Sequence, residues 1–582
     1  MHILERILKF ISSLLKKTGR QISVILSLVS TPFRNAFAAL GKFWKKEESV
    51  EEPVHEPEIP EKTPETPKQY EEHACKSYME LKLCFRDIGR LFAIAETLGR
   101  DYLTAMPEGA SERRLGQISF LYKRMHEDLL SGSIEDKIAD AHMHLKSNPQ
   151  DWDEWDEANL REMQSYCAQK ETLSTDLIEQ QAVLSYNGRR VHRDCLLHND
   201  WKTAREFLKK TVDLHIEIAE RKCRAVKTNS PYEALIQDYM PGVSVSKLNE
   251  WFGELETGIK AMIPEILQKQ EKENSPIAID GKYPASSQMW LNRCLLQVIG
   301  FDFKRGGLYE TGHNPVEGGT PEDTRLVIKT VDGSNFLDSM KSALHEGGHG
   351  IYIQGLPRTT WRYQPVAQDL GSAIHESQAL LIEMLIGRTK EFFAFVSPRL
   401  EGLYHKLHDP ALSCENLYKL KTRVKPGPQR KSADEVTYFL HVLMRKNLEK
   451  RLIEGELKVE DLPDAWNEQM QEHLDVIPET HKDGILQDVH WFVGKFGYFP
   501  AYTIGHMISA QLFEKLNNIF PDLRLKIMQG QFEDIKVWLN ENIHGYGRLY
   551  PMHELIKKAT GKPVSTRALI AHLENRYLKA NI

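Results

Sequence analysis

Apolar residues recur at helical spacing along most of the chain, from about residue 73 to the C-terminus. Three segments show apolar residues at positions i, i+3, i+4 and i+7 especially well: 77–98, 379–396 and 435–455. Alternating strand patterns are few, and the best candidate is 324–330. We see no repeat of fixed period and no internal linker. The pattern therefore predicts that residues 73–582 form one large, mostly α-helical domain.

Two segments of different composition precede this domain. Residues 1–46 are basic, with apolar residues at helical spacing between Ile3 and Leu15, which predicts a short amphipathic helix. Residues 47–72 are acidic and punctuated by proline, which predicts a disordered linker. A basic amphipathic helix can lie in a membrane interface and favour anionic lipids. Two other roles for residues 1–46 stay open. They are a helix that docks on the body of the protein and an organelle transit peptide.

The overall composition excludes several classes of protein. A formal net charge of -6 over 582 residues leaves no global basic surface for nucleic acid. Seven scattered cysteines without close pairing argue against a disulfide framework or a cysteine-built zinc site. No stretch reaches the roughly 18 apolar residues that a spanning helix requires. We therefore expect a cytoplasmic protein whose one membrane contact is peripheral, through residues 1–46.

The sequence His-Glu-Gly-Gly-His begins at residue 345. Residues four apart lie on one face of a helix, so the imidazoles of His345 and His349 can converge on one metal ion. Glu346 can then accept a proton from a metal-activated water as general base. Asn335 as N-cap and Gly355 as a stop signal predict the helix itself. The alternative interpretation is two surface histidines on a helix.

A catalytic zinc ion needs a third protein ligand and an open coordination position. Glu376 and Glu383 lie seven residues apart on a second predicted helix that begins near Gly371, and they face the same way. One of them can bind the metal while the other orients a ligand histidine. An isolated glutamate on a helix usually faces solvent, but the nearby pair of histidines reverses that preference. These residues predict a zinc-type metallopeptidase with His345, His349 and one of the two glutamates as ligands.

Five motifs occur in the same order as in the carboxypeptidase Taq family of metallocarboxypeptidases, which residues 73–582 resemble. They are HEGGHGIYIQG (345–355), HESQ (375–378), RKSADEVTY (430–438), GILQDVHW (484–491) and GKFGYFPAYTIG (494–505). The resemblance therefore covers the whole predicted helical domain.

The resemblance implies a zincin-like, mostly helical, saddle-shaped domain with a long deep active-site groove around the HExxH helix. It implies release of amino acids one at a time from peptide C-termini, with one Zn²⁺ or Co²⁺ per chain, and a homodimer. Glu376 would be the third metal ligand, and Arg430 would grip the free terminal carboxylate of the peptide. His490 and Tyr498 or Tyr502 would assist the developing oxyanion.

The resemblance also implies substrate contacts from His313, Arg325 and Gln487. Two departures from the family pattern lie near these residues. Asn314 follows His313 where the family usually has His-Pro-Phe, and Val327 stands where it usually has threonine.

Two other functions stay open at this point. An endopeptidase or dipeptidase of similar helical fold would share the metal site but lack the carboxylate anchor. A catalytically silent paralogue, tethered by its N-terminus, would use the groove only to hold peptides. The two departures from the family pattern favour the silent paralogue, whereas an intact Glu346 counts against it.

Overall fold

The computed structural model describes residues 73–310, 316–330, 333 and 336–579. The structure is 70% helix and 3% strand, which confirms the predicted mostly α-helical single domain. The predicted N-terminal helix and linker lie outside the described residues. None of the described helices is long and apolar enough to span a bilayer.

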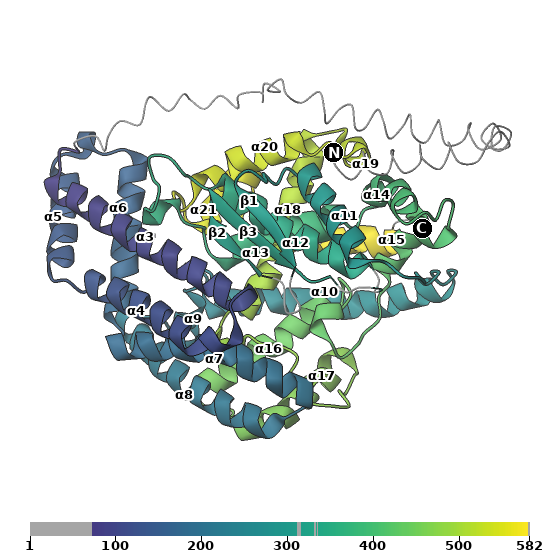
Figure 1. The fold of residues 1–582 in the computed structure, drawn as a ribbon, viewed down its shortest axis with the longest axis horizontal. Helices are drawn as coiled ribbons and strands as arrows, with labels where there is room; N and C mark the ends of the chain where they lie inside the picture. The colour runs from purple at the N-terminus through teal and green to yellow at the C-terminus, as the bar shows by residue number, and fades with distance from the viewer. Residues whose placement is uncertain (1–72, 311–315, 331–332, 334–335, 580–582) are drawn as a thin grey trace, which may run out of the picture. The chain divides into compact units, whose positions relative to one another are not determined.

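Along the chain, one set of helices precedes the strands and a larger set follows them (Figure 1). The first group comprises α3 (Lys76–Thr104), α4 (Ser111–Leu129), α5 (Ser133–Ser147), α6 (Glu154–Glu171), α7 (Thr175–His198), α8 (Trp201–Val226), α9 (Pro231–Ile236), α10 (Val245–Glu271) and α11 (Ala285–Val298). The second comprises α12 (Phe336–Gly355), α13 (Ser372–Leu380), α14 (Lys390–Leu403), α15 (Cys414–Thr422), α16 (Tyr438–Ile453), α17 (Leu462–Leu474), α18 (Phe499–Ile519), α19 (Leu523–Gln529), α20 (Glu533–Asn542), α21 (Met552–Thr560) and α22 (Arg567–Leu573).

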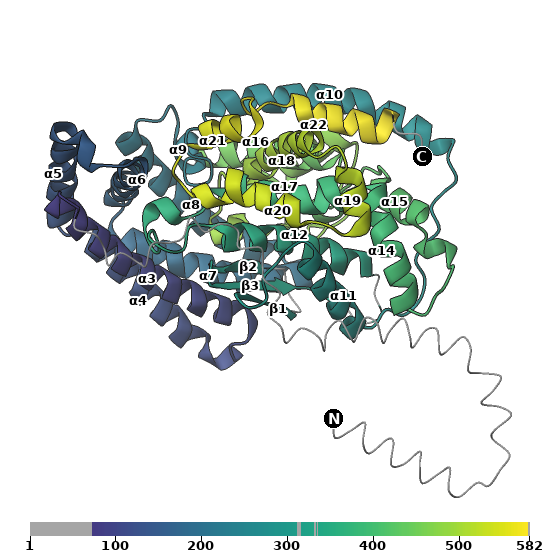
Figure 2. The same ribbon diagram turned by 90° about the horizontal axis from the view of Figure 1, so that it is seen from above.

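Three short strands form one small sheet beside α12. They are β1 (Gly306–Glu310), β2 (Val316–Thr320) and β3 (Asp323–Ile328), in the order β1-β3-β2. The central strand β3 pairs parallel with β1 and antiparallel with β2. β3 confirms the predicted strand, whereas β1 and β2 were not predicted. Both views show the sheet between α3–α6 on one side and α14, α15 and α19 on the other (Figures 1 and 2).

The helix α12 lies in the interior of the domain. Its apolar residues Phe336, Leu337, Met340 and Leu344 are buried, and so are most of the residues on its other faces. A helix that is enclosed all round belongs to a protein core, not to a surface. α12 ends at Gly355, as predicted, while the predicted N-cap Asn335 lies outside the described residues. The core therefore holds the His-Glu-Gly-Gly-His sequence in place.

Two of the predicted helical segments have different bounds in the structure. The segment 379–396 is interrupted: α13 passes into a π-helical turn at Leu381–Ile386, and α14 starts again at Lys390. Thr389 causes the new start, because its hydroxyl accepts from the backbone N–H of Phe392 and caps α14. The segment 435–455 becomes helical only at Tyr438.

α12 and α13 approach each other closely at Gly348. A Cβ built at Gly348 would lie 2.5 Å from the Cα of Ala379 and 2.6 Å from the carbonyl oxygen of Gln378. These are backbone atoms, which cannot move aside without shifting α13. At Gly347 the neighbouring atoms belong to the Leu296 and Ile299 side chains. Close packing therefore explains why this helix contains adjacent glycines despite their cost of about 1 kcal/mol each.

We predict that Gly348→Ala destabilises the protein by about 1–3 kcal/mol, because the added methyl group overpacks the contact between α12 and α13. Gly253→Ala on α10 is the matched control, since nothing lies within 4 Å of its Cβ position. The control should gain up to about 1 kcal/mol from helix propensity. Urea unfolding of both variants measures the difference, and equal stability would contradict the close-contact explanation.

Candidate metal centre

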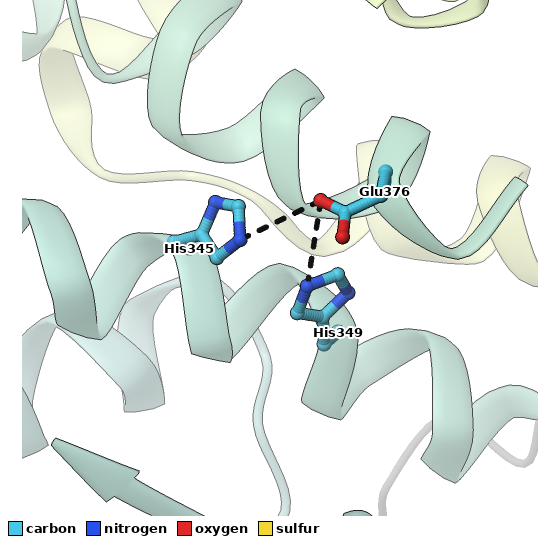
Figure 3. Close-up of side chains that lie close together, drawn as sticks. All are labelled: His345, His349 and Glu376. Carbon is cyan, nitrogen blue, oxygen red and sulfur yellow. Dashed lines mark ion pairs between the residues drawn. The ribbon is translucent and has the colours of Figure 1, made fainter. Parts of the chain in front are cut away.

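Three potential metal ligands meet between α12 and α13. The Nε2 atoms of His345 and His349 lie 3.7 Å and 3.9 Å from Oε2 of Glu376 (Figure 3). One ligand atom from each residue lies within 4.8 Å of the others. A zinc ion binds such donors at about 2.0–2.2 Å, so the three atoms can close on a single ion. These three residues are the ligands that the family resemblance implies.

Each histidine is oriented by a contact at its other ring nitrogen. Nδ1 of His345 lies 2.9 Å from Oε2 of Glu383, and Nδ1 of His349 lies 3.1 Å from the carbonyl oxygen of His375. A carbonyl or an ionised carboxylate can only accept, so both Nδ1 atoms carry the proton. Both Nε2 atoms therefore present a lone pair towards Glu376, which is the tautomer that binds a metal.

Glu383 has the orienting role that the sequence left open between two glutamates. Burial by itself would raise the pKa of Glu383, but Lys341, the hydrogen bond from His345 and Arg388 hold it well below its usual range. The carboxylate is therefore ionised, although it is 5% exposed. Glu383 lies in the π-helical turn Leu381–Ile386, a type of distortion that often occurs at functional sites.

The three potential ligands open onto a cavity of about 1580 Å³. Among its lining residues are five others that the sequence or the resemblance singled out: Glu346, Arg430, His490, Tyr498 and Tyr502. They come from α12, from the turn Arg430–Ser432, from the segment 484–498 and from α18, which are far apart in the sequence. The fold therefore gathers residues from several of the predicted motifs around one space.

The two tyrosines have different partners. The Tyr498 hydroxyl donates to Oε1 of Glu376 at 2.6 Å, so it contacts a potential metal ligand directly. The Tyr502 hydroxyl lies 3.2 Å from Nε2 of His490. Burial holds the pKa of His490 well below its usual range despite the nearby carboxylate of Asp488, so this imidazole is neutral at pH 7.

Arg430 lies in the cavity wall and is 5% exposed. Its Nε and Nη2 atoms donate to Oδ1 of Asp488 at 3.1 and 2.7 Å, and Nη1 donates to the Tyr438 hydroxyl at 2.9 Å. Oδ2 of Asp488 accepts from Nε of Arg445 at 2.6 Å. Asp488 was not predicted as a site residue, although it is the aspartate of GILQDVHW, next to the predicted Gln487.

Of the other predicted substrate-binding residues, none that the structure describes lines the cavity. Gln487 holds the loop that leads to Arg430: its Oε1 accepts from the Arg430 backbone N–H at 2.7 Å. Arg325 on β3 forms a two-point ion pair with Asp323, and it is not among the described residues that line the cavity. His313 lies outside the described residues.

A buried HExxH helix with a carboxylate from a second helix defines a metallopeptidase of the HExxH type. The family model described as "Carboxypeptidase Taq (M32) metallopeptidase" matches residues 80–577. The chain belongs to this family, and it is a metallocarboxypeptidase.

Individual relatives agree with this assignment along nearly their whole length. Thermostable carboxypeptidase 1 of Thermus thermophilus is 30% identical over 520 residues, which cover 86% of this chain and 98% of the relative. The structure of Trypanosoma cruzi metallocarboxypeptidase 1 matches with a TM-score of 0.81 at 31% identity, covering 87% of this chain and 100% of that one. A Pyrococcus furiosus carboxypeptidase structure matches with a TM-score of 0.79 at 28% identity, covering 86% and 99%.

We predict that Glu383→Gln weakens metal affinity by about 10–100-fold, because the amide no longer offers His345 an ionised acceptor. Competition with a chromogenic chelator measures the affinity. Glu391→Gln makes the same chemical change at a surface ion pair with Arg524 and should leave the affinity unchanged. Equal affinities of the two variants would show that Glu383 does not tune the metal centre.

Proposed function

We propose that the protein removes amino acids one at a time from the C-termini of peptides, using a metal ion held by His345, His349 and Glu376. The observation that carries this proposal is that the three potential ligands share one cavity with Glu346 and Arg430. The cavity therefore contains a metal-binding set, a carboxylate that can act as base, and a cation that can bind a terminal carboxylate.

Zn²⁺ is the proposed ion, one per chain, and Co²⁺ is the alternative. Two imidazole nitrogens and one carboxylate oxygen are a common donor set of catalytic zinc, which keeps a further position open. The set found here opens onto the cavity, which fits that requirement. When bound, the ion would polarise the scissile carbonyl and lower the pKa of a water molecule to about 7.

Glu346 is the proposed general base. It follows His345 on α12, lines the cavity and is 6% exposed, so its carboxylate is largely shielded from bulk water. From this position it takes the proton of the attacking water and later delivers that proton to the leaving amine.

His490, Tyr498 and Tyr502 are the proposed hydrogen-bonding groups for the developing oxyanion. Tyr498 also orients the Glu376 carboxylate through its hydroxyl. Tyr502 and the neutral His490 share one hydrogen bond, which fixes both rings beside the cavity. A fixed pair of polar groups needs little rearrangement when charge develops on the substrate.

Arg430 is the proposed anchor for the free carboxylate of the peptide. Three of the five N–H donors of its guanidinium contact Asp488 and Tyr438, which fixes the plane of the group. One N–H on each Nη atom then remains to bind a carboxylate at two points. Gln487 is proposed to support Arg430 through the backbone, while no specific contact favours Arg325 as a substrate ligand.

Three further parts of the proposal concern the chain outside the metal centre. We propose residues 73–582 as the catalytic domain, residues 47–72 as a linker and residues 1–46 as a peripheral membrane contact in a cytoplasmic protein. The basic amphipathic pattern of residues 1–46 supports the membrane contact. Family membership supports a homodimer.

We predict that Glu346→Gln keeps the metal but loses at least about 10²-fold in hydrolysis, because the amide has the same shape and cannot accept a proton. Metal content and release of the C-terminal residue are measured on the same sample. A variant with more than about a hundredth of the wild-type rate would exclude Glu346 as the general base. A wild-type protein that binds peptides and cuts none would be the silent paralogue.

We also predict that amidation of a peptide's C-terminus lowers kcat/KM by about ten- to a hundredfold, because it removes the charge that Arg430 binds. Acetylation of the N-terminus should have little effect. Arg430→Ala should cause a similar loss on free-acid peptides and add little on amidated ones, because both changes delete the same contact. Arg430→Lys should recover only part of the rate, since an ammonium cannot bind both oxygens in one plane.

The comparison of free-acid and amidated peptides on the wild-type protein decides this prediction. The variant Arg430→Ala is less direct, because it also removes one of the two arginine partners of buried Asp488. Thermal unfolding of the variants controls for a loss of stability. If amidated peptides are cut as fast as free acids, or internal bonds are cut first, the protein is an endopeptidase with the same metal centre.

A further inference from the structure

The wall of the cavity is cationic, although the chain as a whole is not. Eleven Lys or Arg residues and six Asp or Glu residues line the cavity, whereas the whole chain has 76 basic and 82 acidic residues. Three of the six acidic residues, Glu346, Glu376 and Glu383, belong to the metal centre, where a divalent cation would offset their charge. The rest of the wall therefore favours anionic groups.

Three of these basic residues lie together near the metal centre, and we call them the cationic cluster: Lys341, Arg388 and Lys421. They come from three separate elements. Lys341 is on α12, Lys421 is on α15, and Arg388 is in the turn that precedes α14. All three are among the residues that line the cavity.

Two carboxylates neutralise the cationic cluster only in part. Nζ of Lys341 lies 3.9 Å, and Nη2 of Arg388 3.4 Å, from the same oxygen of Glu383. Nζ of Lys421 lies 3.8 Å from Oδ1 of Asp338, whose side chain is 90% exposed and therefore screened by water. In these ion pairs three cations share one buried carboxylate and one that is largely solvated. A further buried carboxylate, Glu435, also interacts with the charge of Arg388, but it is itself paired with Arg576 and His572.

The lysine side chains of the cluster are partly buried: Lys341 is 34% and Lys421 19% exposed. Burial lowers the pKa of Lys341, and it lowers the pKa of Lys421 to about 8. Lys421 therefore stays mostly protonated at pH 7, with less water around it than an ordinary surface lysine has. A carboxylate from a ligand would replace part of that lost hydration.

The cluster lies next to the proposed anchor for the terminal carboxylate. Nζ of Lys341 donates to the carbonyl oxygen of Lys431, the residue that follows Arg430, at 3.1 Å. Lys341 is also one helical turn before His345 on α12. The cluster therefore lies beside both the metal centre and the segment that carries Arg430, where the side chain of a bound C-terminal residue would be.

We propose that the cationic cluster binds the side-chain carboxylate of the C-terminal residue, so that the protein prefers peptides that end in Glu or Asp. This inference rests on the proposed function, with Arg430 at the terminal carboxylate. It adds a side-chain preference that neither the metal centre nor Arg430 requires.

The experiment compares three peptides that differ only in the C-terminal residue: Glu, its uncharged isostere Gln, and Leu. At pH 7 and low salt, kcat/KM should be about tenfold higher for Glu than for Gln, the effect of one charge-assisted contact. The Glu/Gln ratio should decrease as salt is added, because ions screen the attraction. Equal rates, or faster release of Gln, would overturn the inference.

Two variants on the same helix assign the preference to the cluster. Lys421→Met should reduce the Glu/Gln ratio by about tenfold and leave the rate on the Leu peptide unchanged. Lys419→Met removes the same charge from α15 at a position outside the cavity lining, and it should preserve the ratio. An unchanged ratio in Lys421→Met would exclude the cluster as the subsite.

The result distinguishes this inference from the proposed function. Release of Leu without a preference for Glu overturns only the side-chain subsite, because carboxypeptidase activity is then present. Failure to release any of the three residues refutes the proposed function, and the subsite with it. If Lys421→Met does not fold, the Glu/Gln ratio of the wild-type protein and its salt dependence decide the question.

Discussion

The close approach of α12 and α13 is the contact on which the metal centre depends. At Gly348 the two backbones meet without a Cβ between them. This approach brings His345 and His349 on one helix within 4 Å of Glu376 on the other. A Cβ at Gly348 would overlap backbone atoms of α13, so the present separation of the two helices, and with it the spacing of the three donors, requires glycine here. Gly348 therefore affects both the packing of α12 against α13 and the spacing of the three potential metal ligands.

A buried ionic group organises the other side of the cavity. Asp488 lies between Arg430 and Arg445, and all three side chains are nearly inaccessible to solvent. Burying such charges is costly unless each is paired and hydrogen-bonded, and here Asp488 accepts from both guanidinium groups. The arrangement fixes the Arg430 side chain in the cavity wall. A flexible surface arginine would lose more conformational entropy on binding a substrate.

The helices could be predicted because their apolar spacing is a local property of the sequence. The long helix α3 follows that pattern, whereas α12 was predicted from its end signals and the HExxH spacing. The strands β1 and β2 could not, since GGLYE and VEGGT are short, rich in glycine and not clearly alternating. Their pairing with β3 depends on residues outside each strand. The interruption after α13 was also missed, because the apolar pattern of 379–396 continues through it.

The sequence by itself determined the chemistry of the metal centre, since helix geometry places His345 and His349 on one face whatever the surrounding fold. It also supplied Glu376 and Glu383 on one predicted helix, but only tertiary packing decided which lies beside the two Nε2 atoms and which contacts Nδ1 of His345. The burial of Arg430 and the gathering of the cationic cluster likewise depend on the tertiary structure. These contacts join residues from separate elements, and their distances follow from packing across the whole domain, which no local spacing encodes.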